Sequence, residues 1–396
     1  MFSPPAPDKG RGDTSADYIL RWTLVGSALA GLPNLTGWNV LPMTFVLNGG
    51  IALSMMVGFF GPRTPSIARA TWLLFAGGYL TVKLTALALG SHPAGPDDLL
   101  QAYKAYIFLV PLVWFIGRKC FTPAGLARTV RQILAVTALK YLIVFAATAG
   151  THRPGVWTEN NFELMLVIGL TYLAWPHLGR NRGWWMTLLC LIVLIGESRS
   201  GVIELALVFV VIFWRPRDPR FLLYVAGGGI VVWLSNYVFS QRSNGSPSDR
   251  WQFWQIFRAE SAAWNLNDWL VGRPPLTPLS LESCDRLAPW GGLRAMNATD
   301  ICYSVGLHMF SLRVLMDQGV LGALFLLLFI WLALRASGAG MRDRVALLGI
   351  GLANSMSVSA FNSEYLLIPL LVAAGLRYRA HPSPTAPPVP VERVSG

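Results

Sequence analysis

Charged residues are scarce in this chain of 396 residues: they make up 13% of it, whereas hydrophobic residues make up 54%. A water-soluble domain could not bury so much apolar surface, so the composition excludes an ordinary soluble enzyme and makes lipid the main solvent. The net charge of +12 does not indicate a nucleic-acid partner, because most of the cations lie between hydrophobic segments, where membrane topology explains them.

The common signatures of soluble catalysis are also missing. The sequence contains no Walker loop, no Cys-x-x-Cys, no His-Glu-x-x-His and no Asp-x-Asp pair that would hold a divalent cation against a nucleotide-sugar. We therefore expect neither a metal nor any other cofactor.

Apolar segments dominate the rest of the chain, and a helix that crosses a bilayer needs roughly 20 such residues. The sequence predicts an all-α polytopic membrane protein with about 12 transmembrane helices, although the seventh with the eighth, and the last two, could instead be re-entrant pairs. The expected spans are 17–33, 41–60, 69–90, 100–117, 132–149, 160–178, 183–197, 201–214, 220–239, 308–334, 344–360 and 364–377.

These spans divide the chain into five parts. A polar, Pro-rich tail (1–16) precedes nine helices (17–239), and one large hydrophilic loop (240–307) separates these from the last three helices (308–377). The ending, 378–396, is again Pro-rich and polar. We expect both tails to be disordered and no signal peptide to be cleaved, with the first span acting as an anchor.

The cations indicate how the spans are oriented. If both tails are cytoplasmic, the short outer connections carry only Arg153 and Arg199. The inner connections then carry 14 cations: Arg63, Arg69, Arg118, Lys119, Arg128, Arg131, Arg180, Arg182, Arg215, Arg217, Arg220, Arg335, Arg342 and Arg344. Cations near span ends resist translocation, so this bias places the large loop outside the cytoplasm.

Four cysteines divide by compartment in this topology. Cys120 lies in an inner connection and Cys190 within a span, so we expect both to stay reduced. Cys284 and Cys302 share the outer loop, where a disulfide could persist. The sequence leaves open whether they pair or remain two thiols.

The first candidate site residue is Arg199, in the Ser-Arg-Ser-Gly hairpin at residues 198–201. A guanidinium at the outer surface can bind a phosphate through two parallel hydrogen bonds. The alternative is an interfacial arginine that merely snorkels towards water.

A helix predicted from Asp249 provides more candidates. Arg250 and Arg258 would add guanidinium groups at the outer surface. Residues at intervals of three or four, most of them aromatic, give the helix an amphipathic face. This face could lie on the membrane or stack on sugar rings. The alternative is an interfacial belt of aromatic residues that binds no ligand. The face comprises Trp251, Trp254, Phe257, Ser261 and Trp264.

His308 begins the tenth span and can accept a proton near neutral pH, although a histidine at a span boundary can also be merely interfacial. Farther along the same span, Arg313 and Asp317 are four residues apart and could pair on one helix face, which we interpret as structural.

Three lysines fall within predicted spans, where an ionisable side chain is a functional candidate. Lys83 and Lys104 lie in the outer half of the membrane and could bind an anionic substrate together with Arg153; Lys140 lies deeper. Alternatively, Glu163 and Glu204 neutralise some of these lysines.

Three features together resemble the O-antigen ligase and polymerase family. They are the Ser-Arg-Ser-Gly hairpin, an arginine early in the outer loop, and a histidine followed by a hydrophobic run to Asp-Gln-Gly-Val-Leu-Gly. Asn160-Asn161 adds to the likeness, which covers roughly residues 150–335. Two positions depart from the family's pattern: Met309 replaces an asparagine and Asp317 replaces a glutamate.

The resemblance implies a bacterial inner-membrane glycosyltransferase with a GT-C-like helical fold and a periplasmic active site. Such enzymes move a glycan from undecaprenyl diphosphate onto a hydroxyl, without metal. The resemblance assigns the catalytic roles to Arg199, Arg250 and His308. The partners would be the lipid-linked donor, a glycan or lipid-linked acceptor and the bilayer, with a flippase and a chain-length regulator as further candidates.

Within this family, polymerisation of polysaccharide repeat units is the favoured interpretation, because no specialised acceptor site is apparent. A ligase that transfers the glycan to lipid A-core or protein is the alternative. From another class, a transporter of lipid-linked oligosaccharides or small molecules would also explain twelve spans. The lack of an obvious internal repeat weighs against transport.

Overall fold

In a computed structural model of the chain, residues 13–34, 41–60, 67–89, 95–214, 222–223, 225–230, 233, 249–274, 276–289 and 301–377 are described. Within these ranges the secondary structure is helical, with no β-strand and one isolated parallel bridge between Phe121 and Leu376. The all-α prediction is therefore confirmed. Both predicted tails, apart from Asp13–Ala16, lie outside the described residues.

The helices follow one another through the whole described chain. Before the large loop they are α1 (Ser15–Arg21), a π-helical segment (Trp22–Gly26), α2 (Ser27–Gly31), α3 (Met43–Phe60), α4 (Ile67–Ala88), α5 (Pro96–Ile107), α6 (Leu109–Phe115), α7 (Pro123–Thr148), α8 (Asn160–Ala174), a 3-10 turn (Trp175–His177), α9 (Arg182–Ile195) and α10 (Arg199–Ile212).

The helices of the large loop are short, and longer helices follow them. They comprise α12 (Asp249–Ser261), α13 (Leu266–Val271), α14 (Leu281–Arg286), a 3-10 turn (Ser304–Gly306), α15 (Phe310–Ala336), α16 (Met341–Ser355), a second turn (Ala360–Asn362) and α17 (Glu364–Gly375).

Local chemistry explains where helix boundaries differ from the predicted spans. The segment 100–117 divides at Phe108 into α5 and α6, because Pro111 cannot donate a hydrogen bond to the carbonyl of Ile107. Helix α7 begins at Pro123 rather than near residue 132: the Thr122 side chain accepts from the amide of Gly125 at 3.0 Å, and proline suits the first turn. The predicted span 220–239 lies largely outside the described residues.

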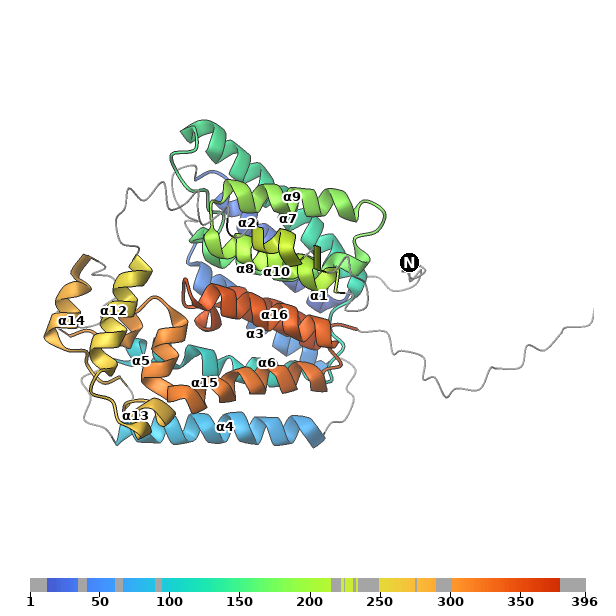
Figure 1. Cartoon of the computed structure of the whole chain (residues 1–396). Coiled ribbons are helices and arrows are strands. Elements are labelled where there is room, and N and C mark those ends of the chain that lie inside the picture. The colour runs from blue at the N-terminus through green and yellow to red at the C-terminus, as the bar shows by residue number, and fades with distance from the viewer. Residues whose placement is uncertain are drawn as a thin grey trace, which may run out of the picture.

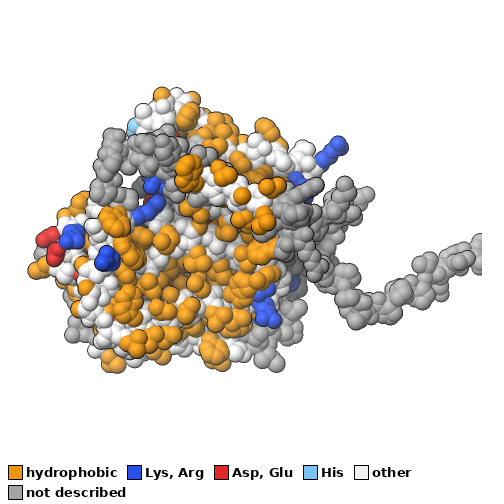
Figure 2. All heavy atoms as spheres, in the orientation of Figure 1, with side chains coloured by type: hydrophobic (Ala, Val, Ile, Leu, Met, Phe, Trp, Pro, Cys, Tyr) orange, Lys and Arg blue, Asp and Glu red, His pale blue; other side chains and the backbone are white. Residues whose placement is uncertain are grey.

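Among the described helices, three are long and apolar enough to cross a membrane: Met43–Phe60, Pro123–Thr148 and Phe310–Ala336. Helices Arg182–Ile195 and Glu364–Gly375 are apolar but shorter. Large apolar side chains point outward from several helices, and Phe45 and Phe60 of α3 are 78% and 86% exposed. Hydrophobic side chains cover the middle of the face in Figure 2, and cations lie towards its ends. Water would be a poor solvent for such a surface, whereas lipid suits it.

The long helices run side by side between two ends of the molecule (Figure 1). One end, here called the site end, carries α12, α13 and α14 together with the connections 149–159, 196–198 and 356–363. The opposite end is tied together by Asp17, which accepts from the amide and hydroxyl of Thr122, and by Lys119, which donates to the carbonyl of Ser337 at 3.0 Å.

The large loop and the start of α15 together build a small second core. Cys284 and Cys302 form a disulfide, which answers the question that the sequence leaves open. The aromatic face predicted for α12 is wrong in part: Phe257 is buried in this core, and the helix ends at Ser261, before Trp264. The helix faces inward with Phe253, Ile256 and Phe257, because side chains three and four apart share a face.

Candidate functional site

The hairpin that carries Arg199 is held tightly at the site end. Ser198 caps α10 by accepting from the amide of Gly201 at 3.1 Å, so Arg199 occupies the first position of the helix. A side chain on Gly196 would lie 3.2 Å from atoms of Leu164 and Tyr141, so this turn packs directly on α7 and α8. Arg199 is therefore presented from a rigid turn.

Two asparagines connect this hairpin to the start of α8. Asn160 donates to the carbonyl of Gly196. The side-chain oxygen of Asn161 accepts from Ser198 at 2.6 Å and from Ser200 at 3.3 Å, and its side-chain nitrogen donates to Glu159 at 2.6 Å. The start of α8 is thus linked to the hairpin, and Asn161 also holds Glu159, so the position of Arg199 is coupled to that of Glu159.

Glu159 in turn faces His308. Its Oε2 lies 3.5 Å from the histidine Nε2, and the two side chains are 37% and 28% exposed. The ring of Phe162 meets the imidazole edge-on at 6.2 Å between centroids. Burial opposes ionisation of Glu159, but His308, Asn161 and Arg153 together lower the pKa of this carboxyl group below its usual value. Glu159 is therefore an anion beside the imidazole at neutral pH.

Arg250 completes the cluster from α12. Its guanidinium donates to the hydroxyl of Ser357, in the connection between α16 and α17. Burial lowers the pKa of Arg250; the positive charge of Arg199 lowers it further, as does that of Arg153, while Glu159 partly offsets both. Arg250 is thus coupled electrostatically to two other arginines and to two carboxylates, those of Glu159 and Asp249, and the excess positive charge favours binding of an added anion.

Electrostatic coupling therefore links four of the predicted site residues: Arg250 is coupled to Arg199, Arg153 and Glu159, and Glu159 faces His308. The cluster combines guanidinium groups with an imidazole that can exchange a proton. Such a site can hold a multiply charged anion and accept a proton from a neighbouring hydroxyl group.

The other loop candidates lie on exposed parts of α12. Trp251 and Trp254 are 51% and 39% exposed, and Trp254 stacks on Phe257 at 5.7 Å. Arg258 is also exposed. These side chains are accessible to a ligand or a membrane surface, but among the described interactions none connects them to His308 or Arg250.

Among the described interactions, neither Lys83 nor Lys104 joins the cluster. Lys104 forms an ion pair with Glu364 at 2.6 Å, and Asn48 donates to the same carboxylate oxygen at 2.6 Å. Lys83 lies over the ring of Tyr79 at 5.8 Å and is coupled electrostatically to Asp317. Both lysines thus have local partners within the helices, and no described interaction connects either of them to Arg250 or His308.

The deeper charged residues also take partners other than those considered from sequence. Lys140 donates to the carbonyl of Gly31 at 2.6 Å, at the end of α2. Glu163 accepts from the amides of Val156 and Trp157 at 2.8 and 2.9 Å. The carboxylate of Glu204 is buried without a hydrogen-bond partner among the described residues. Neither glutamate forms an ion pair with Lys140.

Arg313 and Asp317 do not pair with each other. Arg313 donates to the carbonyl of Gln101 at 2.7 Å and to the hydroxyl of Ser359 at 3.2 Å, whereas Asp317 accepts from Ser304 at 2.7 Å. Helical spacing permits a pair but does not require one, because each side chain finds a partner on a neighbouring segment.

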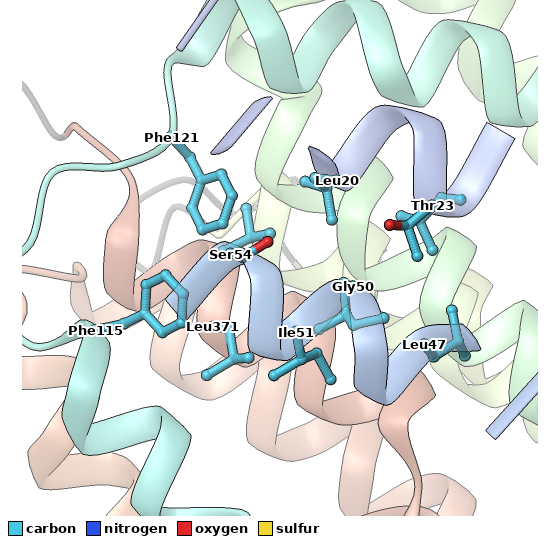
Figure 3. A pocket seen from close by; sticks show the side chains of 12 residues that line it. Leu20, Thr23, Leu47, Gly50, Ile51, Ser54, Phe115, Phe121 and Leu371 are labelled. Carbon is cyan, nitrogen blue, oxygen red and sulfur yellow. The ribbon is translucent and has the colours of Figure 1, made fainter. Parts of the chain in front are cut away.

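An apolar hollow lies elsewhere, between α1, α3, α6 and α17 (Figure 3). Thr23 and Ser54 are the polar side chains at its wall, and the rest of the lining is apolar, with Leu47, Phe115 and Leu371 among it. No charged side chain lines this hollow, so it offers no group for acid–base chemistry or anion binding.

Sequence reasoning missed Glu159 and Ser357. Both lie in short connections and reach the site only because α8, α16 and α17 meet there. The one local signal for Glu159 was its position directly before Asn160-Asn161.

In comparisons with known proteins, no protein-family model, curated protein or solved structure matches this chain.

Proposed function

We propose that the protein is a glycosyltransferase that moves a glycan from a polyprenyl diphosphate onto a hydroxyl group at the outer face of a bacterial inner membrane. The observation that carries the proposal is the electrostatic coupling of Arg153, Arg199 and Arg250 beside the Glu159–His308 pair, at one end of a bundle of apolar helices. A diphosphate headgroup at the membrane surface matches these charges, and its lipid tail matches the apolar flank.

In the proposed reaction, Arg199 and Arg250 bind the diphosphate and stabilise the charge that develops on it as the anomeric bond breaks. His308 accepts the proton of the acceptor hydroxyl, whose oxygen forms the new bond to the anomeric carbon. One displacement inverts that carbon and releases the polyprenyl diphosphate. The residues present account for each of these roles without a metal ion.

Polymerisation of repeat units is the form of this activity that we favour. A ligase acting on lipid A-core or protein uses the same chemistry and differs in how the acceptor is held. The proposal includes a topology of about twelve spans. Both tails lie in the cytoplasm, and α12, α13 and α14 lie in the periplasm. The distribution of arginines supports this topology.

Transport of a lipid-linked oligosaccharide is the competing function. The apolar helices would suit either activity. The clustering of cations with a histidine at one end favours transfer, because a transporter is expected to hold its substrate near the middle of the membrane.

Glycan transfer in liposomes tests the proposal. Purified wild type receives a synthetic polyprenyl-diphosphate oligosaccharide in the presence of a chelator. We expect product from wild type and a loss on the order of a hundredfold in Arg199→Ala and His308→Ala. Arg286→Ala, an exposed arginine paired with Glu282 on α14, serves as the matched control and should retain activity.

Absence of product with wild type, or equal activity in all variants, would contradict the proposed transferase. Product on lipid A-core alone would replace polymerase with ligase.

A further inference from the structure

Glu159 has no role in the transfer chemistry described above, yet it is the carboxylate nearest to His308 among the described residues. The ion-pair distance of 3.5 Å joins Glu159 Oε2 to the histidine Nε2. The other carboxylate oxygen, Oε1, accepts from Asn161 at 2.6 Å. One oxygen is thus anchored to the start of α8 while the other faces the imidazole.

This anchoring continues to the hairpin of Arg199. Asn161 accepts from Ser198 and Ser200, and its own backbone carbonyl accepts from Asn354 of α16 at 2.9 Å. A carboxylate held in this way is preorganised, because the hydrogen bonds that position it already exist before any substrate arrives.

We infer that Glu159 is a positioning residue that orients the His308 imidazole through Nε2 and leaves Nδ1 as the nitrogen that accepts the acceptor's proton. The inference rests on the proposed function. Because Nε2 faces a carboxylate, the neutral ring carries its hydrogen there, and the lone pair is on Nδ1. As the hydroxyl O–H bond breaks, its proton moves to Nδ1 and its electron pair forms the new glycosidic bond.

The electrons of the broken anomeric bond remain on the departing diphosphate. The imidazolium formed in this step lies beside the Glu159 carboxylate, which stabilises its charge as a buried carboxylate does in other histidine-dependent enzymes. Arg153 and Arg250 are also coupled electrostatically to Glu159, whereas Arg199 and Asp249 are coupled to Arg250. The charges coupled to Glu159 are thus positive, so this carboxylate supplies local compensation for a second positive charge on His308.

Steady-state kinetics of Glu159→Gln and Glu159→Asp test the inference. We expect Glu159→Gln to lower kcat by on the order of a hundredfold while the donor KM stays within about twofold. Glu159→Asp keeps the charge and should recover part of kcat. Glu282→Gln, an exposed glutamate on α14, is the matched control.

A second measurement does not depend on activity. Diethyl pyrocarbonate modifies imidazole nitrogens, and mass spectrometry follows each histidine separately. We expect the rate of His308 modification to differ severalfold between Glu159→Ala and wild type, because the imidazole loses the carboxylate that fixes its orientation and the position of its hydrogen. His152 is exposed and provides the internal control.

A wild-type kcat in Glu159→Gln, or equal modification of His308 with and without Glu159, would overturn the inference while leaving the transferase intact. A wild type without transfer activity would instead refute the proposed function, and the modification rates would still decide whether Glu159 holds the ring.

Discussion

Gly272 and Gly319 pack backbone against backbone where α13 crosses a break in α15. Both have positive φ angles, 83° and 64°, and Arg273 donates its amide to the carbonyl of Met316 at 2.9 Å beside them. A side chain on Gly272 would lie 2.6 Å from the amide nitrogen of Gln318. The large loop is thereby docked onto the same helix that His308 precedes.

Substitution of Gly319 should disrupt this docking. In Gly319→Ala, the backbone conformation is accessible almost only to glycine, and the new methyl group meets Leu270. We expect a loss of about 3 kcal/mol in the free energy of unfolding, measured as a lower midpoint of thermal unfolding in detergent. Gly77→Ala on α4, with open space around it, is the control. Equal midpoints for the two variants would contradict a close backbone contact.

The ion pair of Lys104 with Glu364 should act in stability rather than in substrate binding. Removal of one partner by Lys104→Met leaves a buried carboxylate and should cost ~3 kcal/mol. The double variant Lys104→Met, Glu364→Gln removes both charges and should recover most of this loss, while it keeps transfer activity. A stable but inactive double variant would instead assign Lys104 to the substrate.

Glu260 should make the large loop sensitive to acid. Its carboxylate accepts from the amide and hydroxyl of Ser280 and from the hydroxyl of Ser283 at 2.6 to 2.9 Å. Burial opposes its ionisation, but these hydrogen bonds and Arg273 lower the pKa of Glu260. The stabilisation that ionised Glu260 gives the folded loop is therefore complete above its unfolded-state pKa of roughly 4.3. It is lost as pH falls through the lower pKa of the folded state.

Limited proteolysis across this pH range, with an acid-stable protease, measures the effect. We expect cleavage near α14 to increase only in acid for wild type. In Glu260→Gln, cleavage should be faster at neutral pH and should change little with acidity. Identical pH profiles for the two proteins would exclude Glu260 as the titrating group.

The disulfide should stabilise the loop core. Cys284 and Cys302 are separated by 18 positions, and closure of a chain of this size is worth ~3 kcal/mol in the chain-entropy model. We expect Cys284→Ser to hasten proteolysis between α12 and α15, whereas Cys190→Ser in α9 should not. Unchanged cleavage in Cys284→Ser would show that the remaining loop contacts suffice.

Sidedness can be read with single cysteines in a protein that lacks Cys120 and Cys190. Thr151 is exposed after α7 at the site end, and Asn181 is exposed before α9 at the opposite end. In whole cells with a permeabilised outer membrane, an impermeant maleimide should label Thr151→Cys and not Asn181→Cys. The reverse pattern would contradict the proposed orientation.

The sequence predicted the elements that depend on local interactions. Apolar runs such as 41–60 and 308–334 nearly coincide with α3 and α15, because helix formation in an apolar setting depends on neighbouring residues. The same reading of apolar runs and the breaks between them also located the hairpin of Arg199. It failed at α7, where the Thr122-Pro123 cap was overlooked, and at Phe108, where Pro111 interrupts the helix.

Partner choice lay beyond the sequence. Several chemically suitable partners exist for each buried charged residue, and only the packing of distant helices selects among them. This holds for Lys104, Lys140, Arg313 and Asp317.

By itself, the amino-acid sequence determined that this chain is helical and largely apolar, and that Arg199, Arg250 and His308 are chemically suited to a shared site. The tertiary structure decided that these residues meet, that Glu159 accompanies the histidine and that the lysines do not join them. The reason is physical: helix formation and hydropathy depend on nearby residues, whereas the geometry of a charged cluster depends on which connections are brought together by the packing of whole helices.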